Sequence, residues 1–198
     1  MRRRAILLLM AMAAAMVVAG GVAYAATVVC DGAADRDPDP GQCQGTNEAD
    51  EIVGTEDPEV IRMLAGNDLV FGHGGNDEIY GDKGNDVVDA MGGNDTIYGG
   101  PDGDGSSQGG GQFAVDNLEG GGDSDTVYGN GGSDWIDAAA NDTAGSVDIS
   151  IGGRGNDHID AGDGNVDIIN CGRGKDVAFI DVGVDTDIKG CEEKIGVL

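Results

Sequence analysis

Acidic residues recur along the chain at a spacing of nine, and an aliphatic residue follows most of them by two positions. The segment 72–80, Gly-His-Gly-Gly-Asn-Asp-Glu-Ile-Tyr, shows the unit. Carboxylates in a glycine-rich turn, together with turn carbonyls, offer the hard oxygens that Ca²⁺ accepts in loose geometry, whereas Mg²⁺ requires a tight octahedron. The spacing therefore predicts cation binding by Asp50, Asp68, Asp77, Asp86, Asp95 and Asp104, with Glu59 in the one slot that lacks Asp, and by Asp125, Asp134, Asp157, Asp167 and Asp176.

The motifs of common hydrolases are absent from the sequence. Neither His-Glu-x-x-His nor Gly-x-Ser-x-Gly occurs, and His73 and His158 occupy different repeat positions. An Asp pair could still imitate the two carboxylates of a glycosidase, but the periodic placement accounts for the aspartates better. We expect no catalytic site and no enzyme.

Each unit divides into a turn of six residues and an extended stretch of three. Glycine supplies positive φ without steric cost, and Asn tolerates the left-handed region best among the other residues. We therefore expect left-handed backbone at the turn asparagines. The extended residues are β-formers whose middle side chain points to one face, which predicts a narrow aliphatic core. The turn asparagines are Asn67, Asn76, Asn85, Asn94 and Asn156.

Strands of three residues are stable only when neighbouring repeats stack on them. Two nonapeptides close one coil, so residues 18 apart lie on the same side. Asp68 should then stack with Asp86, and Asp77 with Asp95. The period predicts a solenoid of two parallel sheets.

This pattern resembles the hemolysin-type, or repeats-in-toxin, calcium-binding nonapeptide Gly-Gly-x-Gly-x-Asp-x-aliphatic-x. The resemblance spans roughly residues 45–190. It implies an all-β fold, a right-handed parallel β-roll, in which the aspartates and turn carbonyls hold several Ca²⁺ ions between turns. Two units depart from the motif, because Asp123 replaces a turn glycine and Cys171 replaces a first glycine.

The repeats fall into two blocks. A Gly-, Ser- and Gln-rich stretch interrupts them after Pro101, and residues 138–150 are irregular. The expected organisation is a signal peptide at 1–25, an entry loop or cap at 26–44, repeats at 45–104, an inserted loop at 105–117, repeats at 118–181 and a C-terminal cap at 182–198.

The N-terminus predicts export. Three arginines precede an uncharged stretch from Ala5 to Val29, and Ala23-Tyr24-Ala25 suits signal-peptidase cleavage after Ala25. The alternative is an uncleaved membrane anchor; either way the repeats face the outside, and cleavage leaves no membrane insertion. The cleaved chain keeps eight basic and 37 acidic residues, a net charge of −29, which excludes nucleic acid as a partner.

The four cysteines permit three disulfide connectivities. They form two close pairs, Cys30 with Cys43 and Cys171 with Cys191. In an exported chain, local pairing would close both ends of the array, so we expect structural bridges there.

Three tyrosines share one repeat position: Tyr80, Tyr98 and Tyr128. They predict a row on an outer face, either a carbohydrate-stacking strip or ordinary packing of β-formers, and we favour the latter. The expected function is extracellular calcium binding by a self-contained roll. The rivals are a cell-surface adhesion or matrix protein, which would bind an envelope partner, and a secreted hydrolase.

Overall fold

Only strands and turns occur in the described part of the chain. The computed structural model describes residues 26–30, 42–101, 116–139, 144–185 and 187–197, so the expected signal peptide and Asp104 lie outside the described residues. In the described part, no helix is long and apolar enough to cross a membrane. The strands are β1 (Ala26–Val29), β2 (Gln42–Gln44), β3 (Asp50–Val53), β4 (Val60–Arg62), β5 (Leu69–Phe71), β6 (Glu78–Tyr80), β7 (Val87–Asp89), β8 (Thr96–Pro101), β9 (Asn117–Glu119), β10 (Thr126–Gly131), β11 (Trp135–Asp137), β12 (Ile149–Arg154), β13 (His158–Ala161), β14 (Ile168–Arg173), β15 (Val177–Asp181), β16 (Asp187–Lys189) and β17 (Glu193–Val197).

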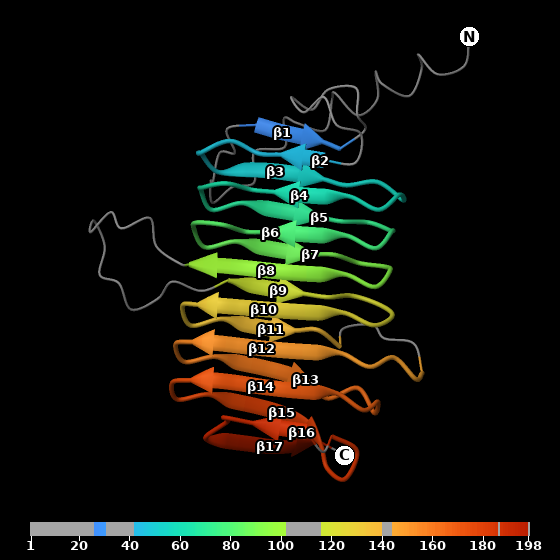
Figure 1. Ribbon diagram of the computed structural model, residues 1–198, viewed down its shortest axis with the longest axis vertical. Helices are drawn as coiled ribbons and strands as arrows, with labels where there is room; N and C mark the ends of the chain where they lie inside the picture. The colour runs from blue at the N-terminus through green and yellow to red at the C-terminus, as the bar shows by residue number, and fades with distance from the viewer. Residues whose placement is uncertain (1–25, 31–41, 102–115, 140–143, 186, 198) are drawn as a thin grey trace, which may run out of the picture.

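The strands form two parallel sheets that alternate along the chain. Odd-numbered strands β1 to β17 make one sheet and even-numbered strands β2 to β16 the other, each in sequence order. Figure 1 shows the resulting stack, with β1 at one end and β17 at the other. In the first block, partners such as Leu69 and Val87 lie 18 residues apart. The predicted two-sided parallel β-roll is confirmed.

A narrow aliphatic core lies between the sheets. The middle residue of each short strand points inward, so Val70, Val88 and Leu118 stack in the odd sheet. Ile61, Ile79 and Ile97 do the same in the even sheet, and all six are at most 1% exposed. Burying one such side chain stabilises the fold by roughly 1.5–3 kcal/mol.

The turns correct one expectation. The left-handed non-glycine residues are not the predicted turn asparagines. They are Asp123 together with residues that stand four positions before the next aspartate of the nine-residue period, such as Leu64, His73 and Asn130. Asp123 thus adopts the conformation of the glycine that it replaces, with φ at 81°.

The asparagines instead connect successive coils. The amide of Asn85 donates to Oδ1 of Asn67 at 3.2 Å, and the amide of Asn94 donates to Oδ1 of Asn76 at 3.1 Å. Lys175 donates in the same way to Asn156. A side-chain acceptor is required here because a turn amide at this position has no strand partner.

Both ends of the roll are closed as the cysteine spacing predicted. Disulfides join Cys30 to Cys43 and Cys171 to Cys191. In the last strand, Lys194 takes the register position of the core residue Ala178 and is exposed. A charged terminal strand discourages another chain from adding to the sheet.

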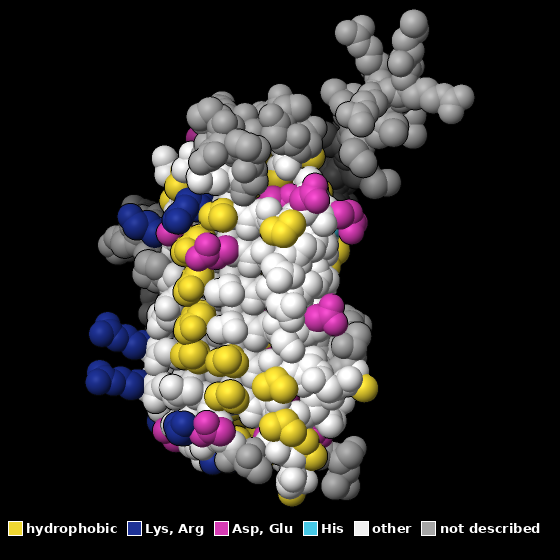
Figure 2. All heavy atoms as spheres, turned by 45° about the vertical axis from the view of Figure 1, so that its right-hand side comes forward, with side chains coloured by type: hydrophobic (Ala, Val, Ile, Leu, Met, Phe, Trp, Pro, Cys, Tyr) yellow, Lys and Arg dark blue, Asp and Glu magenta, His cyan; other side chains and the backbone are white. Residues whose placement is uncertain are grey.

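The outer surface repeats the period of the fold. Figure 2 shows one face, on which apolar side chains form a column along the length of the roll. Such a column arises because each outward position of a parallel strand is stacked on the same position of its neighbour.

Candidate metal centre

Buried carboxylates form two rows along the roll, one beside each sheet. Nearly all of these residues directly precede a strand, while Asp50 begins β3 and Asp185 stands two residues before β16, so stacking the strands also stacks the acids. The odd row consists of Asp50, Asp68, Asp86, Asp116, Asp134, Asp157 and Asp176. The even row consists of Glu59, Asp77, Asp95, Asp125, Asp148, Asp167 and Asp185. All fourteen residues are at most 6% exposed.

In every aspartate of the rows after Asp50, Oδ1 accepts a hydrogen bond from the preceding coil. The amide of Asp50 donates to Oδ1 of Asp68 at 2.7 Å, and the amide of Asp68 donates to Oδ1 of Asp86 at 2.9 Å. In the even row, the amide of Asp77 donates to Oδ1 of Asp95 at 2.8 Å. These bonds fix the side-chain rotamers, so the second oxygens are fixed as well.

That second oxygen is the distinguishing feature of the site. Six aspartates keep an Oδ2 atom that is buried and accepts no hydrogen bond: Asp68, Asp77, Asp86, Asp95, Asp157 and Asp176. A buried polar atom without a partner is rare and costly in a folded protein. A repeated set of such atoms indicates that something other than the chain completes them.

The surroundings of these oxygens fit a hard cation. A Cβ placed on Gly72 would lie 3.0 Å from Oδ2 of Asp77 and 2.7 Å from the carbonyl oxygen of Ala90. A Cβ placed on Gly120 would lie 2.7 Å from both Oδ2 of Asp125 and the carbonyl oxygen of Ala138. Glycine therefore leaves open a space lined by one carboxylate and one carbonyl oxygen, the donor types that Ca²⁺ prefers.

Side chains alone do not surround a cation. Among the described residues, no group of three or more His, Cys, Asp or Glu side chains is placed to hold a metal ion. Any ion must therefore draw on backbone carbonyls as well. This matches the sequence pattern, in which a single acid accompanies each glycine-rich turn.

Burial disfavours the charged form of these carboxyls. Desolvation, the largest cause, raises the pKa of Asp77 to about 7 and that of Asp86 to about 8. It raises the pKa of Asp68, Asp95 and Asp157 to about 6, although an amide from the preceding coil opposes the shift in each case. Neighbouring carboxylates add to the rise, as Asp116 and Asp68 do for Asp86.

The same arrangement explains why a dication would stabilise the fold. Adjacent strands lie about 4.8 Å apart, and two like charges at that distance repel by roughly 3 kcal/mol at an effective dielectric of about 20. Bound calcium supplies compensating positive charge. Each ionised carboxylate is then paired with a positive ion, and the row is no longer a column of uncompensated buried like charges.

The rows contain most of the predicted site residues and four further acids. Asp104 lies outside the described residues, and Asp116 occupies the position after Asp86. Glu59 heads the even row, as the period suggests. Asp116 has the expected aliphatic Leu118 two residues later, a signal that the interruption obscured. Asp148 and Asp185 lack that signal, because Ser150 and Asp187 follow them.

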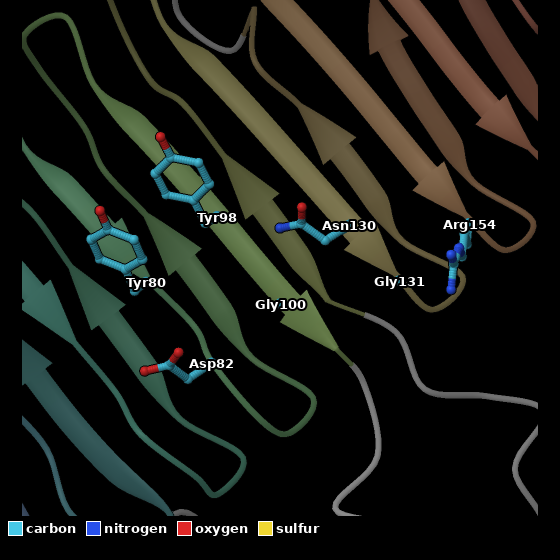
Figure 3. A pocket seen from close by; sticks show the side chains of 7 residues that line it. All are labelled: Tyr80, Asp82, Tyr98, Gly100, Asn130, Gly131 and Arg154. Carbon is cyan, nitrogen blue, oxygen red and sulfur yellow. The ribbon is translucent and has the colours of Figure 1, made fainter.

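The tyrosine row stacks ring upon ring. Tyr80 and Tyr98 have centroids 4.9 Å apart, and Tyr98 and Tyr128 are 5.0 Å apart. Arg62 covers the free face of Tyr80 at 4.1 Å, and Ile151 follows Tyr128 in register. The faces that a sugar would stack on are therefore occupied, which favours packing over a carbohydrate strip. Tyr80, Tyr98, Asp82 and Arg154 help to line a groove of about 410 Å³. Figure 3 shows the side chains of these residues.

His158 also belongs to an outer-face stack. Its ring lies 3.8 Å from that of Trp135 and 4.8 Å from that of Phe179. Desolvation by these neighbours lowers the pKa of His158. This environment is that of an aromatic packing residue.

Comparison with known families agrees with the geometry. The model of the RTX calcium-binding nonapeptide repeat matches in four copies, at residues 44–88, 71–105, 111–143 and 142–178. No curated protein and no solved structure matches the chain. The four copies cover most of the roll, including every residue of the two carboxylate rows except Asp185. The chain therefore belongs to the RTX calcium-binding nonapeptide-repeat family, and it is a calcium-binding β-roll protein.

Proposed function

We propose that this protein is exported and that calcium outside the cell completes its fold. The observation that carries the proposal is the set of six buried Oδ2 atoms without a hydrogen-bond donor. Calcium held by these oxygens and by turn carbonyls would neutralise the rows from within. The interior aspartates of both rows are the proposed side-chain ligands.

The free energy of calcium binding is large enough to decide whether the chain folds. Extracellular calcium sites have Kd values of about 10⁻⁴ to 10⁻³ M, and calcium at about ten times Kd stabilises the folded state by roughly 1.4 kcal/mol per site. Six such sites would contribute roughly 8 kcal/mol, which is comparable to the whole stability of a typical domain. The narrow core cannot replace that contribution, so the metal-free chain should be largely unfolded.

Export accounts for how the chain reaches calcium. Free calcium is low inside cells, so a newly made chain would stay loose until it is secreted. The two disulfides fit an oxidising compartment, and the arginine-led apolar N-terminus fits secretion. These features support an extracellular location.

The proposed role is structural or interactive and not catalytic. The buried acids are held by amides in both rows, so each has a place in the fold that needs no reaction to explain it. A calcium-loaded roll is a rigid rod with two extended faces. Such a rod suits a matrix or cell-surface component.

Isothermal titration tests the proposal directly. The secreted chain, stripped with a chelator and dialysed, is titrated with CaCl₂ and in parallel with MgCl₂. We expect several calcium ions to bind with Kd values near 10⁻⁴ to 10⁻³ M and magnesium to bind much more weakly. The absence of calcium binding under these conditions would overturn the proposed function.

A further inference from the structure

The first turn of each carboxylate row differs from the turns that follow. Thr46 stands four residues before Asp50, and it donates to Oδ2 of Asp50 from its amide at 2.5 Å and from its hydroxyl at 2.7 Å. Thr55 stands four residues before Glu59. Its amide donates to Oε2 at 3.0 Å, and its hydroxyl donates to Oε1. Both oxygens of Glu59 thus accept hydrogen bonds from the chain, whereas Oδ1 of Asp50 is buried and accepts none.

The backbone explains why later turns lack these bonds. The corresponding residues Leu64, His73, Asp82 and Met91 have φ between 63° and 78°. The Oδ2 atoms of Asp68, Asp77, Asp86 and Asp95 accept no hydrogen bond. Thr46 and Thr55 are not among the left-handed residues, and their N–H groups point at the carboxylate. Conformation and hydrogen bonding therefore separate two classes of turn.

The even row ends in the same way. Oδ1 of Asp185 accepts from the amide of Asp167 at 2.9 Å, and Oδ2 accepts from the amide of Asp181 at 2.7 Å. Both oxygens are thus occupied by donors of the chain. At an end, a coil has a neighbour on one side only, so it can offer an ion fewer carbonyls than an interior coil can.

We propose that Glu59 and Asp185, the two ends of the even row, are cation-free positions, at which hydrogen bonds of the chain replace calcium, while calcium binds only at the other positions of the rows. The inference rests on the proposed function, because it states which acids of the same two rows bind calcium and which do not. Asp50 keeps a buried oxygen without a donor and so stays among the predicted metal ligands. The first turn of the even row then needs no metal and gives the calcium-bound coils a template on which to stack.

Counting bound ions tests the inference. Native mass spectrometry of the full secreted chain in saturating calcium would compare wild type, Glu59→Gln and Asp77→Asn. Each variant removes one charge from the same row, and circular dichroism checks that it is folded. We expect Glu59→Gln to keep the wild-type number of ions and a calcium midpoint within twofold, and Asp77→Asn to lose at least one ion.

The outcomes separate the two claims. A wild-type chain that binds no calcium overturns the proposed function, whereas a wild-type chain that binds it and a Glu59→Gln variant that loses an ion overturns only the inference. A crystal structure of the wild type grown with calcium decides the matter even if a variant does not fold. Ions at interior turns and none at 55–59 or 181–185 support the inference, and an ion on Glu59 or Asp185 refutes it.

Thr55→Val probes the donor itself. It removes the hydroxyl from Glu59 while keeping the side-chain shape, so we expect a lower melting temperature in saturating calcium and an unchanged ion count. Thr27→Val, at an exposed position of β1 that is not next to a carboxylate of either row in the chain, is the matched control. A loss of ions in Thr55→Val with none in the control would contradict a metal-free cap.

Discussion

The amide of Asp86 donates a hydrogen bond of 2.8 Å to Oδ1 of Asp116, which lies 30 residues further along the chain. Elsewhere in the first block the same bond joins residues 18 apart, as from Asp68 to Asp86. The row therefore continues unbroken across the interruption. The bond between coils, and not the count of residues, defines which acids belong to the row.

Chelation should unfold the roll. At neutral pH, an excess of chelator removes the ions that offset the repulsion within the rows, so we expect most of the far-ultraviolet β signal to disappear and to return when calcium is added. Circular dichroism measures both steps, and magnesium at the same concentration is the control. Full β signal in chelator would show that the fold does not need calcium.

Asp86→Asn should weaken the calcium-loaded protein. Asn keeps the Oδ1 acceptor but removes the charge that holds the ion, so losing one site at calcium ten times its Kd costs roughly 1.4 kcal/mol. Asp82→Asn removes a charge from the same turn at a half-buried, left-handed position that Asn tolerates. In thermal denaturation with calcium, the melting temperature should fall clearly for Asp86→Asn and change little for Asp82→Asn. An equal fall in both variants would mean that the loss of a negative charge, and not the loss of a calcium ligand, destabilises the protein.

Acid should partly replace calcium. The folded-state pKa values of Asp77 and Asp86, about 7 and about 8, lie above the unfolded value near 3.9. The metal-free fold is therefore favoured most below about pH 4, and this contribution is lost as pH rises through about 6 to 8. In chelator, we expect more β signal at pH 5 than at pH 8.

Calcium binding should show the opposite pH trend. Protons compete with calcium for the same oxygens, so the calcium concentration at the folding midpoint should fall as pH rises from about 6 to 8. Titrations followed by circular dichroism at several pH values measure this. A calcium midpoint that does not change with pH would show that the carboxyls with raised pKa values do not bind calcium.

Gly93→Ala should prevent the turns from stacking. Gly93 has φ at 127°, and a Cβ there would overlap the carbonyl oxygen of Gly75 in the preceding coil. We expect loss of calcium-induced folding or a large drop in melting temperature. A Cβ at Gly131 meets no atom within 4 Å, so Gly131→Ala is the control and should fold normally.

Reducing the disulfides should destabilise the ends. The bridges span 13 and 20 residues, and loops of this size contribute about 3 kcal/mol each through the entropy of the unfolded chain. In saturating calcium, the double variant Cys171→Ser with Cys191→Ser should therefore melt at a lower temperature than wild type. An unchanged melting temperature would show that the last coil is held by packing alone.

The repeating features of this protein can be predicted from its local sequence. A period of nine in Asp77, Ile79 and their counterparts predicts a turn, a short strand and an inward aliphatic residue, because these depend on contacts within a few residues. Doubling the period predicts which residues stack, as Tyr80 does on Tyr98. The two cysteine pairs predict closed ends because each pair is close in the chain.

The features that break the period depend on the folded roll. Asp116 and Asp148 enter the rows across spacings of 30 and 23 residues, which hydrogen bonds between coils select and local spacing does not encode. The same is true of the asparagines, whose side chains bond to the next coil, and of Thr46 and Thr55, whose donors bond to the first carboxylate of each row. A donor and an acceptor meet there because the chain has closed a coil, and coil closure is a property of the stacked roll.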